Sequence, residues 1–200
     1  MSTQAPSMEA QSVTDLVSHF ESHLGPIVSG WSRDELGHEL SFTVALYERG
    51  PVSGTRTLGT LGLSKTPLPM RSPGSHVRLE VVMLYRDADG HGTLPSVLQD
   101  VCKQVLRDQR ALLRGHVLGP RGPLTAGSTL EALYVAVPVY FPDTFATFVG
   151  SDLEPIVVAW LVPISSAEAQ FVRHEGWETF EQLLVAVDPD LLDLSRASIV

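Results

Sequence analysis

Two predominantly apolar stretches, residues 130–138, in which Glu131 is the one polar residue, and 155–163, constrain the fold of this chain more than any other feature. Each has the length of a β-strand, and neither alternates with polar residues as a strand with one solvated face would. Residues 78–85 are also dense in apolar and β-branched side chains, which predicts a further central strand. Because strands of this kind need cover on both faces, the sequence predicts a sheet packed between helices.

The remaining elements follow from the spacing of apolar residues. Positions three or four apart predict helices, and strict alternation predicts strands. On this basis we expect helices over 12–24, from Pro95 to Leu113, over 167–173 and over 177–187, strands over 41–48 and 57–63, a loop over 68–74 and a long irregular connection over 115–127. The order of these elements predicts an α/β (α+β) fold, with a single mixed sheet of about five or six strands flanked by helices.

The distribution of charge is uneven. The 200 residues hold 14 Lys and Arg against 23 Asp and Glu, a net charge of −9, which disfavours direct binding to nucleic acid. Between Asp143 and Asp193 there are ten acids and one base, so this segment carries the whole net charge, while the rest holds 13 acids and 13 bases. Two interpretations stay open: an acidic surface that attracts a basic partner, or a solvated acidic face that aids solubility.

The sequence lacks the features typical of secreted and membrane proteins. A single cysteine, Cys102, allows no intramolecular disulfide, and its place in an apolar helical pattern predicts a buried, inert thiol. The first residues lack the basic and apolar regions of a secretory signal. No apolar run reaches the roughly 18 residues that a membrane span needs. We therefore expect a soluble cytoplasmic protein that binds no membrane.

Motifs for metal or catalytic chemistry are incomplete. His19 and His23 have the spacing of two zinc ligands, but Phe20 stands where a zinc protease needs Glu, and no third ligand is evident. Asp87 and Asp89 resemble the opening of a calcium loop that lacks its bidentate Glu, so a plain turn is expected. Neither a nucleophile elbow nor a Walker loop occurs. The sequence predicts no metal site, no cofactor and no catalytic residue.

The C-terminal helices carry the main signal for binding. Gly176 breaks the chain between two predicted helices and presents Trp177 at the start of the second. Aromatic residues are enriched in the energetic centres of protein interfaces, although a tryptophan is often simply core. With Glu175, Glu178 and Glu181 around it, Trp177 predicts a protein-binding surface.

An alternative rests on His116, which lies in the glycine-rich segment 115–127. Long irregular loops often carry binding and catalytic residues. His116 is therefore a candidate either for the partner surface or for the active site of a hydrolase or another enzyme that binds a small molecule. Against the enzyme stands the lack of a chemical partner at a suitable spacing.

Four stretches, taken in order, resemble the suppressor of fused family, in particular its bacterial single-domain members. The segments 175–184 and 188–196 (EGWETFEQLL and DPDLLDLSR) resemble the family's closing helix and tail. Residues 19–26 resemble its opening helix, 79–84 its Glu-Leu-Val-Met-Leu strand, and Gly115-His116 with Gly127-Ser128 its Gly-His loop before a strand. The chain departs from the family around 50–76, and after His116 it has Val117 where a Thr is usual.

This resemblance implies a mixed α/β domain over residues 12–196, preceded by a flexible N-terminus at 1–11. It also implies a non-catalytic protein-binding role. In the animal member a second domain helps to clamp the partner, and because this sequence ends at Val200 we expect no such clamp here. Bacterial relatives are associated with polymorphic toxin systems as immunity proteins. The expected partner is therefore another protein, either a basic toxin or a regulatory protein that is sequestered.

Overall fold

Nine strands form one mixed sheet in the computed structural model, which describes residues 8–70, 72–150 and 154–200. The strands are β1 (Ile27–Arg33), β2 (Glu39–Tyr47), β3 (Thr55–Leu61), β4 (Leu68–Pro69), β5 (His76–Arg86), β6 (Val117–Leu118), β7 (Leu130–Ala136), β8 (Thr147–Val149) and β9 (Pro155–Ser165). Their order is β1-β2-β3-β5-β9-β7-β6, with β4 paired to β5 and β8 paired to β9. The central pair, β5 and β9, is parallel, and every other pair is antiparallel.

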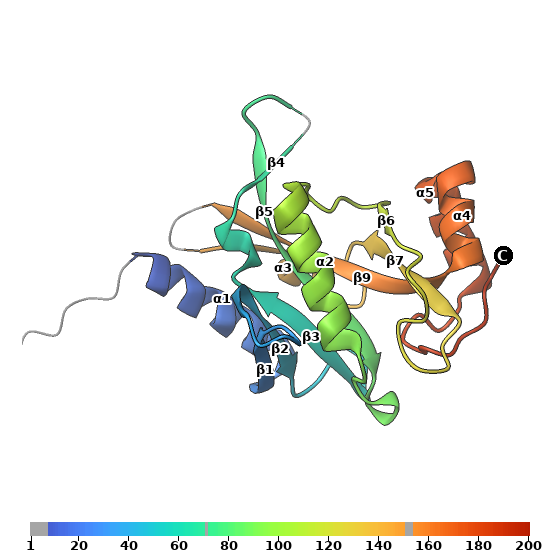
Figure 1. Ribbon diagram of the computed structural model, residues 1–200, viewed down its shortest axis with the longest axis horizontal. Coiled ribbons are helices and arrows are strands. Elements are labelled where there is room, and N and C mark those ends of the chain that lie inside the picture. Colours follow the sequence, from blue (N-terminus) through green and yellow to red (C-terminus); the bar gives the residue numbers. More distant parts are fainter. Residues whose placement is uncertain (1–7, 71, 151–153) are drawn as a thin grey trace, which may run out of the picture.

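Helices cover both faces of this sheet (Figure 1). Those of the described residues are α1 (Met8–Leu24), α2 (Leu94–Asp108), α3 (Asp143–Ala146), α4 (Ser166–Glu175) and α5 (Trp177–Val187), with 3-10 turns at Leu63–Lys65 and Asp87–Asp89. The apolar face of α2 packs on one side of the sheet, and α1, α3, α4 and α5 pack on the other. The predicted α/β class with a single mixed sheet flanked by helices is confirmed.

The central strands contribute side chains to both cores. In β5, Leu79, Val81 and Met83 belong to the core under α2, whereas Val82 and Leu84 belong to the core under α1. The apolar residues of β9 alternate between the two cores in the same way. Because burial of each large aliphatic side chain stabilises the fold by roughly 1.5–3 kcal/mol, a strand in this position favours a predominantly apolar sequence. The prediction of two covered faces is thus confirmed.

The predicted number of strands, five or six, is too low. The missed strands are the edge strand β1 and the short strands β4, β6 and β8, whose sequences do not alternate for long enough to be recognised. The loop expected over 68–74 contains β4, in which Leu68 and Pro69 pair with Val77 and His76. A proline is tolerated there because β4 is a short edge strand.

Two helix boundaries also differ from the predictions. Gln109 adopts a left-handed conformation with φ of 47°, and its backbone N–H donates a hydrogen bond to the carbonyl of Val105. The helix α2 therefore ends at Asp108. Leu112 continues the apolar pattern because it re-enters the same core from an irregular segment. At the other end of the chain, α1 begins at Met8, so residues 8–11 of the predicted flexible terminus are helical, and residues 1–7 lie outside the described residues.

Membrane crossing can be assessed for the helices. Within residues 8–70, 72–150 and 154–200, none of them combines the length and the apolar character that a bilayer span requires.

Candidate functional site

Trp177 joins the start of α5 to the turn that precedes β6. Gly176 has φ of 87° and ends α4, which turns the chain so that the indole packs on Gly115. The approach is so close that a Cβ added to Gly115 would lie 2.5 Å from Cγ of Trp177. The guanidinium carbon of Arg114 lies 4.7 Å from the centre of the indole ring, in a cation–π contact.

Glu181, one helical turn after Trp177, completes this junction. Arg114 donates from Nε to Oε1 of Glu181 at 3.0 Å and from a second nitrogen to Oε2, and the Tyr134 hydroxyl donates to Oε1 at 2.8 Å. Burial alone would raise the pKa of Glu181, but the hydrogen bonds from Arg114 and Tyr134 outweigh it and hold the pKa below its usual value. Glu181 therefore anchors α5 to β7 and to the Arg114 turn.

Glu175 and Glu178 lie on the outer side of the same helix pair. Both are exposed, and the ion pairs of the described residues include neither of them. A shallow groove runs along this side of α5, lined by Trp177, Glu178, Glu181, Gln182 and Val185. Val185 is 82% exposed. Of the residues predicted from sequence, the structure thus places Glu175, Trp177, Glu178 and Glu181 together, with Glu181 serving an internal contact.

The acidic C-terminal segment is less uniform than its composition indicates. Four of its ten acids form ion pairs with arginines from elsewhere in the chain or from its tail: Glu154 with Arg78, Glu168 with Arg196, Glu181 with Arg114 and Asp190 with Arg86. Asp152 lies outside the described residues. Among the acids that form no ion pair in the described structure, Glu175, Glu178 and Asp188 lie at the two ends of α5. Three of the five described acids of this segment without an ion pair therefore flank this helix, and the other two are Asp143 and Asp193.

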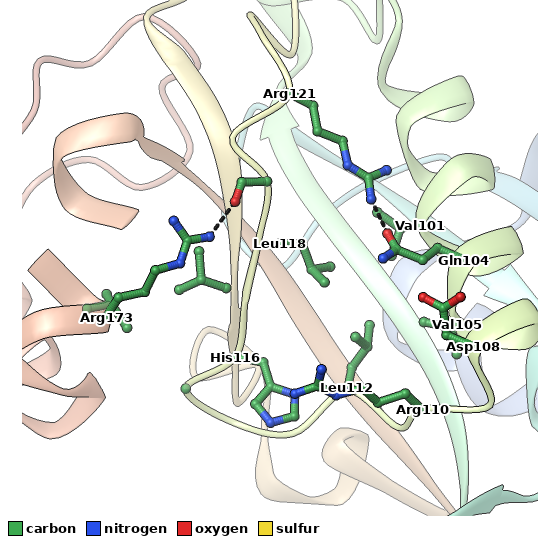
Figure 2. A pocket seen from close by; sticks show the side chains of 14 residues that line it. Val101, Gln104, Val105, Asp108, Arg110, Leu112, His116, Leu118, Arg121 and Arg173 are labelled. Atoms are coloured by element: carbon green, nitrogen blue, oxygen red, sulfur yellow. Dashed lines mark hydrogen bonds between the residues drawn. The ribbon is translucent and has the colours of Figure 1, made fainter. Parts of the chain in front are cut away.

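His116 lies in a different depression. Its Nδ1 accepts a hydrogen bond from the amide of Leu113 at 3.2 Å, and its carbonyl accepts one from the amide of Val135 at 2.9 Å. The imidazole lines a cleft of about 350 Å³ between α2, the Gly115–Gly119 segment and α4 (Figure 2). This cleft shares no lining residue with the groove on α5.

The lining of the cleft does not favour the hydrolase alternative. Among its fourteen described lining residues there is no Ser, Thr, Cys, Lys or Tyr, the side chains that most often act as nucleophiles. Of the two groups suited to acid–base chemistry, His116 and Asp108, the latter is paired with Arg107 at 3.2 Å. The described lining of the cleft thus holds no hydroxyl, thiol or amine nucleophile beside a base.

The other chemical candidates pack as structural residues. His19 stacks on Phe145, and His23 directs Nδ1 at the carbonyl of His19, 2.9 Å away. Within the described chain no group of three His, Cys, Asp or Glu side chains is arranged to hold a metal ion. Cys102 is fully buried as predicted, and burial raises the pKa of its thiol well above the usual value.

Sequence reasoning missed Arg114 and Tyr134, which hold α5 in place, and it named Gly115 only as part of a glycine-rich loop. Arg114 and Glu181 are 67 positions apart, and Tyr134 and Glu181 are 47 apart, so no local pattern connects them. The one local indication in the sequence was that Gly115, at the start of the irregular 115–127 segment, directly follows Arg114.

Replacing Gly115 with alanine is expected to lower the free energy of unfolding by about 2–4 kcal/mol, because both strain and overpacking result. Gly115 has φ of +87°, and its new Cβ would collide with Trp177. The matched control is Gly122→Ala, which has φ of +93° but no atom within 4 Å of the added Cβ. Urea unfolding measures both variants, and equal losses would show that contact with Trp177 contributes nothing.

Both the sequence and the fold of this chain are similar to those of known proteins. The family model for Suppressor of fused protein (SUFU) matches residues 39–197. A search of curated proteins finds no match. A solved SUFU homologue from Neisseria gonorrhoeae FA 1090 aligns with a TM-score of 0.72 and 16% identity, over 96% of this chain and 98% of that one.

Two further solved structures have the same fold. A chain from the Sufu–Fu complex aligns with a TM-score of 0.70 and 13% identity, over 94% of this chain and 92% of that one. Drosophila Suppressor of Fused aligns with a TM-score of 0.69 and 12% identity, over 94% of this chain but 51% of that one. With a family model that matches most of its length, this chain belongs to the suppressor of fused family.

Proposed function

We propose that this protein is a non-catalytic binding module that holds a partner protein against the outer surface of α5. We define the α5 surface as Glu175, Trp177, Glu178, Gln182, Val185 and Asp188. The observation that carries the proposal is the groove along α5, where an aromatic ring and a highly exposed valine lie beside an acid that forms no ion pair in the described structure. Membership of a family in which one solved protein is seen as a Sufu–Fu complex supports a protein partner.

The chemistry of the α5 surface favours a partner segment that is both basic and apolar. Glu175 and Glu178 lie at one end of the helix and Asp188 at the other, so the field around the groove is negative and would steer a cationic partner. Val185 and the indole edge would supply apolar contact. A basic toxin and a basic regulatory protein in the cytoplasm would both satisfy this chemistry. Immunity against the toxin and sequestration of the regulatory protein would use the same surface.

The test begins with affinity capture from the native cytoplasm at low and moderate salt, with identification by mass spectrometry and purification of the captured protein. We expect Glu175→Lys/Glu178→Lys to weaken its binding at least about tenfold and to flatten the dependence of affinity on salt. Glu181 is left unchanged, because its substitution would also release Arg114 and Tyr134.

A matched control keeps the change in net charge the same. Glu35→Lys/Glu48→Lys alters two exposed acids next to β1 and β2, at the edge of the sheet far from α5 (Figure 1). If this control weakens binding as much as the α5 variant does, then overall charge rather than the α5 surface governs the interaction. If neither variant changes affinity, the proposed surface is wrong.

A further inference from the structure

Most described arginines of this acidic protein form ion pairs, and three of those that do not line the same cleft. Seven of those in the described chain form ion pairs with carboxylates: Arg33, Arg56, Arg78, Arg86, Arg107, Arg114 and Arg196. Among the described arginines that form no such pair, Arg110, Arg121 and Arg173 all line the cleft that contains His116. Three of the four described arginines without an ion pair therefore line one cleft, and the fourth, Arg49, lies outside it.

These three arginines come from separate parts of the fold. Arg110 follows the end of α2, Arg121 follows β6 and Arg173 lies on α4. Figure 2 shows Arg110 beside His116 at one end of the cleft and Arg121 at the other, with Arg173 approaching from the α4 side.

Two of these guanidinium groups donate hydrogen bonds to neutral acceptors. Arg121 donates to the side-chain oxygen of Gln104, and Arg173 donates to the carbonyl of Gly119 (Figure 2). A neutral acceptor satisfies a hydrogen bond but leaves the charge of the guanidinium uncompensated, so an anion can compete for it. Arg114 and Arg196 differ, because each donates two hydrogen bonds to a carboxylate. Arg114 uses Nε and one terminal nitrogen, and Arg196 uses both terminal nitrogens.

One acid also lines the cleft. Asp108 is hydrogen bonded by its neighbour Arg107 at 3.2 Å, and this bond together with one from Gln104 holds the pKa of Asp108 below its usual value. Its ion-pair partner lies outside the lining, and the charge of Arg121 inside the lining also lowers its pKa, so one acid faces three arginines in the cleft. The balance of charge inside the cleft remains positive.

The floor of the cleft is apolar and its size suits a small molecule. Val101, Val105, Leu112 and Leu118 lie between the charged ends, and the volume of about 350 Å³ falls in the range typical of small-molecule sites. We infer that this cleft binds a small organic anion that carries two phosphate or carboxylate groups, one held by Arg121 and the other by Arg110. The planar donor fork of arginine matches both kinds of group. This inference concerns a surface separate from the α5 surface and does not depend on a protein partner.

The test uses two simple probes, inorganic pyrophosphate and citrate, titrated into the ¹⁵N-labelled protein at constant ionic strength. We expect saturable shifts of the amides of Arg110, His116, Gly119 and Arg121 with at least one probe. A response to pyrophosphate alone would assign a phosphorylated ligand, and a response to citrate alone would assign a polycarboxylate. Absence of saturable shifts at these amides with both probes would overturn the inference.

Variants separate site binding from general attraction. Arg110→Gln and Arg121→Gln should each weaken binding of the responding probe by about tenfold, the loss expected for one charge-assisted hydrogen bond. Arg49→Gln is the matched control, because Arg49 also forms no ion pair in the described chain but lies beside Gly25, outside the cleft lining. An equal loss in the Arg49 variant would show nonspecific attraction and would refute the site. Circular dichroism of each variant confirms that the fold is retained.

Discussion

Replacing Arg196 with methionine is expected to lower the free energy of unfolding by about 3–5 kcal/mol, because it leaves a buried carboxylate without its cation. Arg196 holds Glu168 through two parallel hydrogen bonds of 2.6 and 2.9 Å. The side chains of Arg196 and Glu168 are only 4% and 0% exposed. The same guanidinium donates to the carbonyl of Pro163 at 3.0 Å, so it ties the C-terminal tail to both α4 and β9.

A second variant distinguishes the unpaired charge from simple loss of packing. Glu168 forms a capping box with Ser165 at the start of α4, and glutamine can take the same role. We therefore expect Arg196→Met/Glu168→Gln to recover a large part of the stability that Arg196→Met loses. Urea unfolding at neutral pH measures the three proteins. If the double variant is no more stable than the single one, an uncompensated charge is not the cause.

The dependence of stability on pH gives an independent check of this pair. Burial alone would raise the pKa of Glu168, but Arg196 and the amides of Ser165 and Ile199 outweigh burial and lower it. A carboxyl with a lowered pKa in the folded state contributes stability above its unfolded pKa, and this contribution is lost as the pH falls through the folded value. The double variant should lack this loss of stability on the acid side.

Replacing Glu80 with leucine is expected to cost about 3–6 kcal/mol, because buried donors lose their shared acceptor. Glu80 is fully buried in β5. Its Oε1 accepts from the amides of Gly62 and Ser64 at 2.9 and 3.1 Å and from the Ser64 hydroxyl at 2.6 Å, and its Oε2 accepts from the Thr60 hydroxyl at 2.6 Å. Leucine would leave the two amides of the 3-10 turn without a partner.

Glutamine at the same position is the matched control. Its carbonyl oxygen can accept from Gly62 and Ser64, and its amide can donate to Thr60, whose hydroxyl lies 3.4 Å from the carbonyl of Val81. We expect Glu80→Gln to lose less than about 1.5 kcal/mol, a value near one hydrogen bond. Unfolding in urea separates the two variants, and a loss in Glu80→Gln as large as in Glu80→Leu would refute the account.

The charge of Glu80 predicts a pH effect of opposite sign to that of Glu168. Burial raises the pKa of Glu80, and the hydrogen bonds from Ser64, Thr60 and Gly62 only partly oppose it. The folded state therefore keeps a proton that the unfolded state releases, so this contribution to stability is complete below the unfolded pKa and is lost as the pH rises through the folded value. In Glu80→Gln this fall of stability with rising pH should be absent.

Several parts of the architecture could be predicted because their signals are local. The predominantly apolar runs at 130–138 and 155–163 indicated strands covered on both faces, since side chains alternate between the two sides of every strand. Apolar spacing indicated the helices, and Gly176 indicated the break between α4 and α5. The short strands could not be found, because two or three residues do not make a period.

What the sequence by itself determined is the class of the fold, the two-sided sheet and the position of Trp177 at the start of α5. The tertiary structure alone decided which charges remain accessible. Composition placed the whole net charge between Asp143 and Asp193, yet Arg78, Arg86 and Arg114 reach into this segment from 76, 104 and 67 positions away. The physical reason is that the spacing of apolar residues reports the local chain path, whereas ion pairs form wherever the folded sheet brings opposite charges together.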